Sequence, residues 1–458
     1  IDKMFAFIQE SVDYDDEDPV CLDNLGQAYY RVTGEKDKAK EWFEKAHAEK
    51  DSQIDTLWFL SRYDLEAGDK AAAIAKLEKA LDAVLSGTGE HSSLVCAVTA
   101  QGTLRTGETA RLLQADSGAL GVQLTISRPV QRAVEAVAAS TMTSGCILVL
   151  DTATAAVRAS VSVPCYDPEH LADSLQAENS PFLNRALQSY AVGSVFKPVL
   201  AATALEAGLQ PVFECTGAVV VDGQIFRCAG GVPHGQVDLA AALEKSCNGY
   251  FIRLGQQLGA ESLLDAAKDF GFGQSLPLAE GLAAEAGQLP APQELAQSGQ
   301  LANFSFGQGS LLAAPMQVAA LFNTIAADGV YRSPYVLQAT LDETTGQPVE
   351  TLSHPRGRRV ISAQNAALLR AMLVQVVQQG TAQDAAGLSG GAGGKTGTAQ
   401  TGQFTPEGTE RCNLWFAGFW PAEKPRYTIV VLQDGAVHTA YSGAAIFAQV
   451  CNALEAAG

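Results

Sequence analysis

Short apolar segments with the length of β-strands begin the last two thirds of the chain. Cys146–Leu150 is a continuous apolar run, and Val157–Val163 alternates between apolar and polar side chains. Asp151–Thr154, between them, carries residues that are typical of turns. A strand buried on both faces reads as an apolar run, and a half-buried strand alternates, so this pattern predicts a β-hairpin.

Three further strands are predicted near the end of the chain, at Lys395–Gln400, Leu414–Phe419 and Tyr427–Leu432. A helix is predicted from about Ala444, and another over Val130–Ala139, because their apolar residues recur at helical spacing. The five strands are split between the two ends of one region, with helices inserted between them. We therefore expect an α+β fold, in which helices cover one five-stranded antiparallel sheet and the insertion forms an all-helical subdomain.

The first 86 residues show a different periodicity, because a set of apolar and glycine positions recurs after 34 or 35 residues. The first set is Leu22, Leu25, Gly34, Phe43 and Ala46, and the second is Leu57, Leu60, Gly68, Leu77 and Ala80. This is the period of tetratricopeptide repeats. We expect residues 1–86 to form an α-helical repeat domain, residues 87–118 a linker or small β segment, and residues 119–458 the main domain.

The chain is acidic, with a formal net charge of −19 and no basic clusters. This composition argues against nucleic acid and anionic membrane surfaces as partners. No run of 18 apolar residues is present, so any membrane tether is expected outside this sequence. The repeats form either a concave surface for a basic or neutral protein partner or a helical spacer.

The nine cysteines form no C-x-x-C pattern, and only six histidines are present. This spacing disfavours a structural zinc site, and we expect neither a metal nor an organic cofactor. Cys215 and Cys228 flank a predicted hairpin, where they form either a disulfide or two free core thiols. We expect Cys247 to be a small buried thiol and His234 to be structural.

Ser194 and Lys197, three residues apart, are the first candidates for catalytic chemistry. They share one face if their segment is helical. Pro198 places the start of that helix near Ser194, because proline is tolerated in the first turn and rejected by the helix interior. The hydroxyl would then lie beside free backbone N–H groups. A lysine whose pKa is lowered by burial can accept the hydroxyl proton and so activate the serine.

Two later segments complete a known set of motifs. Residues 246–248 read S-C-N, and residues 395–398 read K-T-G-T after a run of glycines. S-x-x-K, S-x-N and K-T-G are the motifs of penicillin-binding proteins and serine β-lactamases. The segments 183–186 and 415–418 also look like that family. Residues 119–458 therefore resemble the transpeptidase domain of a class B penicillin-binding protein.

The resemblance implies acyl transfer through a serine ester. Ser194 would be the nucleophile and Lys197 the candidate general base. Ser246 would relay a proton toward the leaving amine, and Asn248 would hydrogen-bond both the lysine and a substrate amide. Lys395 would add positive charge that lowers the pKa of Lys197.

The K-T-G-T segment would bind substrate. The resemblance implies that Thr396, Gly397 and Thr398 line the substrate site, with the two hydroxyls directed at a terminal carboxylate. The backbone N–H groups of Ser194 and Thr398 would form the oxyanion hole. The glycines before Lys395 would keep the strand edge open, so that a substrate peptide can add to it as another strand.

The function implied by the resemblance is that of a peptidoglycan D,D-transpeptidase, which cross-links stem peptides and is acylated by β-lactams. Its place would be extracytoplasmic, facing the cell wall, with a membrane anchor in the full-length protein. One alternative is a D,D-carboxypeptidase or β-lactamase of the same fold. The other is a non-catalytic penicillin-binding sensor or scaffold that works through the helical repeats.

Overall fold

The structure is a computed structural model that describes residues 18–30, 35–50, 120–167, 179–279, 281–342, 345–354 and 356–457, together with a few short pieces between residues 12 and 177. The chain divides into two compact units. The first comprises Ile1–Gln123 and Ala339–Leu352, and the second comprises Leu124–Gln338 and Ser353–Gly458. Each unit is described by itself.

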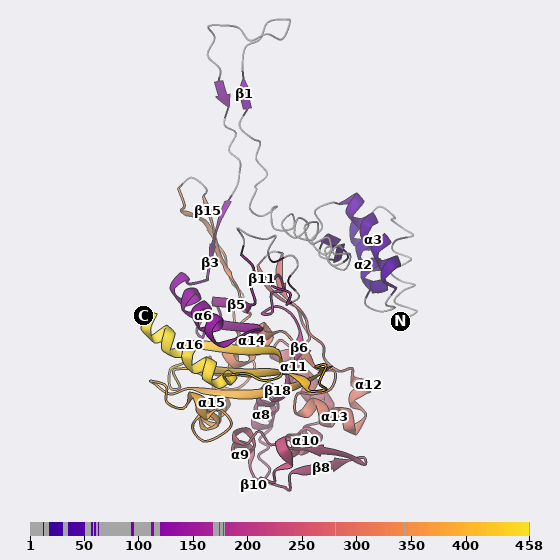
Figure 1. Ribbon diagram of the computed structural model, residues 1–458, viewed down its shortest axis with the longest axis vertical. Helices are drawn as coiled ribbons and strands as arrows, with labels where there is room; N and C mark the ends of the chain where they lie inside the picture. Colours follow the sequence, from indigo (N-terminus) through magenta and orange to yellow (C-terminus); the bar gives the residue numbers. More distant parts are fainter. Residues whose placement is uncertain are drawn as a thin grey trace, which may run out of the picture. The chain divides into compact units, whose positions relative to one another are not determined.

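The second unit is built on a five-stranded antiparallel sheet with the strand order β18-β19-β20-β4-β5 (Figure 1). Its strands are β4 (Gly145–Asp151), β5 (Val157–Val163), β18 (Gly393–Phe404), β19 (Glu410–Trp420) and β20 (Tyr427–Ala436). The sequence predicted all five, and the observed strands of the last group extend beyond the predicted ranges. The order places β18, which carries the K-T-G-T segment, at one edge of the sheet.

Helices cover both faces of this sheet. Phe447 of α16 (Gly443–Ala457) packs against the ring of Phe416, and α16 also contacts α6 (Arg128–Thr141). On β20, Thr428 donates a hydrogen bond to Asn323 of α14 (Pro315–Ala326) at 3.0 Å. Thr428 lies opposite Phe419 of the neighbouring strand, so these two side chains are on the same face of the sheet. Phe416 is three residues before Phe419 and points to the other face, because side chains alternate along a strand. The sheet is therefore the middle layer of the unit, with α14 on one face and α16 on the other.

The insertion between β5 and β18 differs in part from the predicted all-helical subdomain. It contains helices, but also short antiparallel pairs such as β7 (Phe213–Cys215) with β10 (Gly235–Val237), and β8 (Ala218–Val221) with β9 (Gln224–Arg227). Strands of three or four residues are too short for alternation to identify them. The predicted turn at residues 222–223 is the connection of the second pair.

The remaining elements of the second unit follow the chain between and after these hairpins. They are β6 (Tyr190–Ala191), η2 (Gly193–Phe196), α8 (Lys197–Glu206), η3 (Ala229–Gly231), α9 (Leu239–Glu244), α10 (Asn248–Leu258), α11 (Ala260–Asp269), β11 (Leu276–Ala279), β12 (Leu282–Ala284), α12 (Pro292–Leu295), α13 (Ser298–Ser305), β13 (Leu312–Ala313), β14 (Val330–Tyr331), β17 (Arg358–Arg359), α15 (Ala363–Gln378) and η4 (Gln383–Ala385). Most of the apolar side chains of these elements join the sheet in one continuous core.

In the first unit, α2 (Pro19–Ala28) and α3 (Lys36–Glu49) form a helix pair. Gly26 permits their close approach, because a Cβ there would lie 2.7 Å from the ring of Phe43. β1 (Ser93–Val95) pairs with β2 (Arg111–Leu113), and β3 (Leu120–Leu124) joins β15 (Leu337–Asp342) and β16 (Pro348–Thr351) in a three-stranded sheet. Most of the predicted second repeat lies outside the described residues, so the repeat domain and its boundaries stay predictions. Within the described residues, no helix combines the length and apolar character needed to cross a membrane.

Candidate active site

Ser194 lies at the start of a helix. The chain turns through η2, a 3₁₀ turn, and continues directly into α8, with Pro198 in the first turn of the α-helix. Val195 and Phe196 are fully buried in the core and hold this turn in place, whereas Ser194 is half-buried. The helix therefore begins where the proline argument predicts, and the hydroxyl stays accessible.

Two glycines allow three distant segments to meet at Ser194. Gly193 has φ of 65°, and its N–H donates to the carbonyl of Gly307 at 2.8 Å. A Cβ on Gly193 would lie 2.7 Å from the carbonyl oxygen of Thr398, and one on Gly397 would lie 3.1 Å from the backbone nitrogen of Val195. Only glycine permits this backbone contact, so the nucleophile turn and the K-T-G-T strand lie directly against each other.

The Lys197 ammonium is fully buried and held by the second motif. Its Nζ donates to the backbone carbonyl of Ser246 at 2.8 Å, to the Ser246 hydroxyl at 3.1 Å and to Oδ1 of Asn248 at 2.7 Å. Burial lowers the pKa of Lys197 to about 7. The amine can thus exchange a proton near neutral pH, within a hydrogen-bonded group that fixes its position.

The second motif is placed by the turn between α9 and α10. Ser246 has φ of 52°, in the left-handed region that a serine rarely adopts. Cys247 is the N-cap of α10, and its sulfur accepts the N–H of Tyr250 at 3.4 Å. Asn248 donates through Nδ2 to the carbonyl of Arg227 at 2.9 Å, which fixes the orientation of its amide. The turn directs Ser246 and Asn248 to Lys197 and buries the sulfur between them.

Lys395 is the second fully buried lysine of the site. Its Nζ donates to the carbonyl of Thr396 at 3.1 Å. Burial, followed by the positive charge of Lys197, lowers the pKa of Lys395 well below its ordinary value.

The substrate-side residues lie along β18, the edge strand. The two threonines alternate with the buried Lys395 and Gly397, and Thr398 is exposed. The hydroxyl of Thr396 lies 2.6 Å from that of Thr381, which follows α15. The structure therefore brings the three motifs together. It adds Thr381, for which the spacing of the motifs gave no signal.

One group of side chains beside the site could hold a metal ion, among the residues that the structure describes. It consists of Cys215, Cys228, His234 and Cys247. Cys215 and Cys228 are free thiols with their sulfur atoms 3.6 Å apart, so of the two predicted alternatives the structure shows no disulfide.

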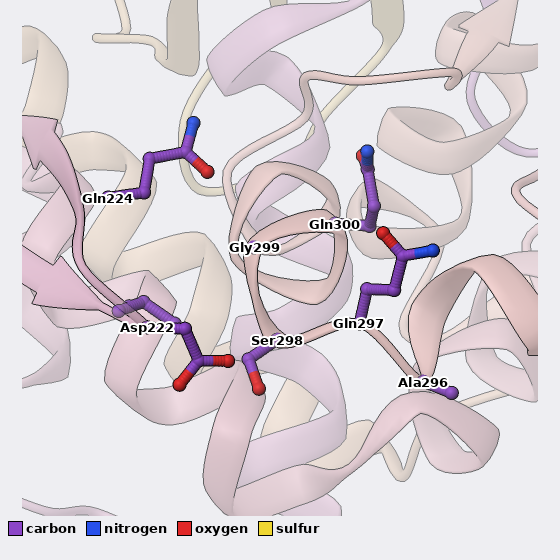
Figure 2. A pocket seen from close by; sticks show the side chains of 8 residues that line it. Asp222, Gln224, Ala296, Gln297, Ser298, Gly299 and Gln300 are labelled. Carbon is purple, nitrogen blue, oxygen red and sulfur yellow. The ribbon is translucent and has the colours of Figure 1, made fainter.

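A pocket of about 360 Å³ lies between the β8–β9 hairpin and the start of α13. Figure 2 shows Asp222 and Gln224 on one side of it and residues 296–300 on the other. None of the three motifs contributes a lining residue. The pocket is therefore separate from the serine and lysine cluster.

The region that contains these motifs is similar to known proteins. The family profile described as "Penicillin binding protein transpeptidase domain" matches residues 145–454. The peptidoglycan D,D-transpeptidase PbpA of Mycolicibacterium smegmatis is 32% identical over 364 residues, which are 73% of this chain and 72% of that protein.

Solved structures agree in fold. The D,D-transpeptidase domain of a peptidoglycan glycosyltransferase from Eggerthella lenta superposes with a TM-score of 0.67 at 27% identity, over 74% of this chain and 84% of that one. Penicillin-binding protein A from M. tuberculosis, solved as a ceftriaxone acyl-enzyme complex, superposes with a TM-score of 0.66 at 27% identity, over 75% of this chain and 80% of that one.

Proposed function

The chain belongs to the class B penicillin-binding protein transpeptidases, and from this membership we infer that it is a peptidoglycan D,D-transpeptidase that works through a serine acyl-enzyme and is acylated by β-lactams. The observation that carries this proposal is the buried Lys197 amine. It is held by Ser246 and Asn248 and lies one helical turn from Ser194. This is the arrangement of an activated serine nucleophile.

In the first step, Oγ of Ser194 attacks the carbonyl carbon of the penultimate residue of a stem peptide that ends in D-Ala-D-Ala. Lys197, with a pKa of about 7, accepts the hydroxyl proton. The backbone N–H groups of Ser194 and Thr398 stabilise the developing oxyanion. As the C–N bond breaks, Lys197 returns this proton through the Ser246 hydroxyl to the leaving amine, and an ester of Ser194 remains.

In the second step, the amine of another stem peptide attacks the ester carbonyl and releases the Ser194 hydroxyl with a new peptide bond in place. The donor peptide lies along the open edge of β18 as an added strand. Before acylation, Thr396 and Thr398 receive the terminal carboxylate of the donor, which leaves with the terminal D-Ala, and Lys395 supplies positive charge. Asn248 holds both Lys197 and a substrate amide.

The hydrolytic alternatives need a group that activates water for attack on the ester. The three acceptors of the Lys197 ammonium are a backbone carbonyl, a hydroxyl and an amide oxygen, and none is a carboxylate. The hydrogen bonds of Lys197 therefore do not separate the transpeptidase from the hydrolytic alternatives, and the lifetime of the acyl-enzyme is the measurement that does.

The proposal extends to location and to the first 86 residues. A peptidoglycan cross-linking enzyme meets its substrate outside the cytoplasm, facing the cell wall. The helix pair α2 and α3, with Gly26 against Phe43, is compatible with a tetratricopeptide-like unit that presents a surface to a protein partner.

Incubation with a fluorescent penicillin tests the central claim. The wild-type protein should become labelled at a single serine, and the label should persist, because an acyl-enzyme of a transpeptidase deacylates slowly. Ser194→Ala should abolish labelling, while Ser140→Ala, on the exposed side of α6, should label like the wild type. Label that decays within minutes would favour a β-lactamase, and an unlabelled wild type would contradict the proposed function.

A further inference from the structure

Four potential metal ligands converge behind the second motif. The sulfur of Cys228 lies 3.6 Å from that of Cys215 and 3.8 Å from that of Cys247. Nδ1 of His234 lies 3.4 Å from the sulfur of Cys215. All four ligand atoms lie within 4.8 Å of one another.

These separations match the edges of a tetrahedron around a metal ion. With Zn–S bonds of about 2.3 Å and a Zn–N bond of about 2.0–2.1 Å, tetrahedral geometry places two sulfur ligands about 3.8 Å apart and a sulfur and a nitrogen about 3.6 Å apart. A disulfide requires an S–S distance of about 2.05 Å and joins only two sulfurs. The sulfur of Cys228 lies at the spacing of two ligands of one tetrahedral ion, and not at the disulfide distance, from the sulfurs of both Cys215 and Cys247.

The elements that carry the ligands form a built site. Cys215 ends β7, Cys228 follows β9, His234 precedes β10, and Cys247 caps α10. The N–H of His234 donates to the carbonyl of Cys215 at 3.0 Å, which holds the imidazole beside that sulfur. The three cysteines are buried and His234 is half-buried, so the imidazole is the ligand nearest to solvent.

We propose that Cys215, Cys228, His234 and Cys247 bind one zinc ion as a structural Cys₃His site. Three thiolates and one imidazole in tetrahedral arrangement are a donor set that selects zinc over magnesium or calcium. On binding, each of the three S–H groups releases its proton to solvent, and each sulfur forms a bond to zinc without any change of oxidation state. The two positive charges of the ion leave the site with a net charge of −1.

The role of the ion is to position the second motif. Cys247 lies between Ser246 and Asn248, both of which hold Lys197. A metal bond at Cys247 fixes the turn in which Ser246 adopts its left-handed φ, and it ties that turn to both hairpins of the insertion. Zinc then positions Ser246 and Asn248 through Cys247, which lies between them, although neither residue binds the ion itself.

Sequence spacing concealed this site. Its ligands follow one another at intervals of 13, 6 and 13 residues, so no C-x-x-C pair reveals it. The expectation that a zinc site is absent therefore rested on a pattern that this fold does not need. The β7–β10 and β8–β9 pairs bring the ligands together instead.

Metal analysis of the purified full chain tests the proposal, with Zn²⁺ as the only added ion. The wild type should contain about one zinc per chain, as a four-coordinate structural site requires. Its Co²⁺ form should show the intense thiolate charge-transfer and tetrahedral ligand-field bands of a sulfur-rich site. Cys228→Ser and His234→Ala should lose the metal, while Cys451→Ser, a buried thiol outside the cluster, should keep it.

The affinity for Zn²⁺ shows how much each ligand contributes to metal binding. Loss of an outer-shell partner typically costs about 10–100-fold in metal affinity, so loss of a ligand should cost more than this. Chelation should also slow acylation by penicillin, and added Zn²⁺ should restore the rate in the wild type but not in His234→Ala.

A zinc-free wild type that does not take up Zn²⁺ or Co²⁺ would overturn the proposal, as would a Cys215–Cys228 disulfide found by mass spectrometry. Both measurements use the wild-type protein, so they do not depend on whether a variant folds. They are independent of penicillin labelling, so the zinc site and the proposed function can fail separately.

Discussion

Two lysines without exposed surface stand beside Ser194, and their burial determines their chemistry. Lys197 donates to three neutral oxygens, and Lys395 donates to the carbonyl of Thr396. Burial is the largest cause of the lowered pKa in both cases. The sequence identified both residues through their motifs, but burial and hydrogen bonding depend on segments far apart in the chain.

The lowered pKa of Lys197 predicts a pH dependence. Burial lowers the pKa of Lys197, and the thiol groups of Cys247 and Cys228 act in the opposite direction. Below about pH 7 Lys197 is protonated and cannot accept the proton of Ser194, so the second-order rate constant of penicillin acylation should rise with pH through about 7 and then level off. Between about pH 7 and the ordinary value of 10.5 the unfolded chain binds more protons than the folded one, so the contribution of this lysine to stability also rises with pH.

Acylation rates measured by stopped flow across this range check the prediction, with spontaneous penicillin hydrolysis subtracted at each pH. A rate constant that is constant from about pH 6 to about pH 8 would contradict the assignment of Lys197 as the base.

At the scale of the element, α14 is anchored to the sheet by a buried polar group. Asn323 accepts from the hydroxyl of Thr428 at 3.0 Å and donates to the carbonyl of Thr152 at 3.3 Å, and the two threonine hydroxyls lie 3.3 Å apart. All three residues are buried. Because they are buried, their side chains depend on these mutual hydrogen bonds.

We predict that Asn323→Ala lowers the free energy of unfolding by about 1–3 kcal/mol, because it leaves buried polar groups without partners. Denaturant titration measures this change. Asn452→Ala, on the exposed face of α16, is the matched control and should change little. Equal stability of the two variants would show that the buried group contributes nothing to the fold.

The elements also show what the sequence could predict. Four of the five sheet strands follow from apolar runs or alternation, while β18 carries the polar K-T-G-T segment, and the start of the catalytic helix follows from Pro198. Among the two- to four-residue strands of the insertion, the β8–β9 hairpin was expected from its turn at residues 222–223. The others could not be found, because alternation needs more positions than they have. The cysteine cluster was missed for a related reason: those short strands, and not local spacing, bring its members together.

At the scale of the whole molecule, all the hydrogen bonds that define the candidate site lie within the second unit. A chain that lacks residues 1–86 should therefore be acylated by penicillin at the wild-type rate to within about a factor of two, since a domain with its own core folds alone. Comparison of the two proteins by rate of labelling checks this. Loss of labelling in the shorter chain, with the circular dichroism of its remaining domain unchanged, would assign a catalytic contribution to residues 1–86.

The strand order of the main sheet has a consequence for biosynthesis. Thr152, just after β4, and Thr428, in the neighbouring β20, are separated by 276 residues along the chain. β4 therefore stays without this partner until β20 has left the ribosome, and β18 and β19 are made only shortly before β20. Such long-range pairing folds slowly and leaves strand edges exposed meanwhile. A nascent chain that stalls before β18 would lack the K-T-G-T strand. It could therefore neither cross-link a peptide nor be acylated by a β-lactam.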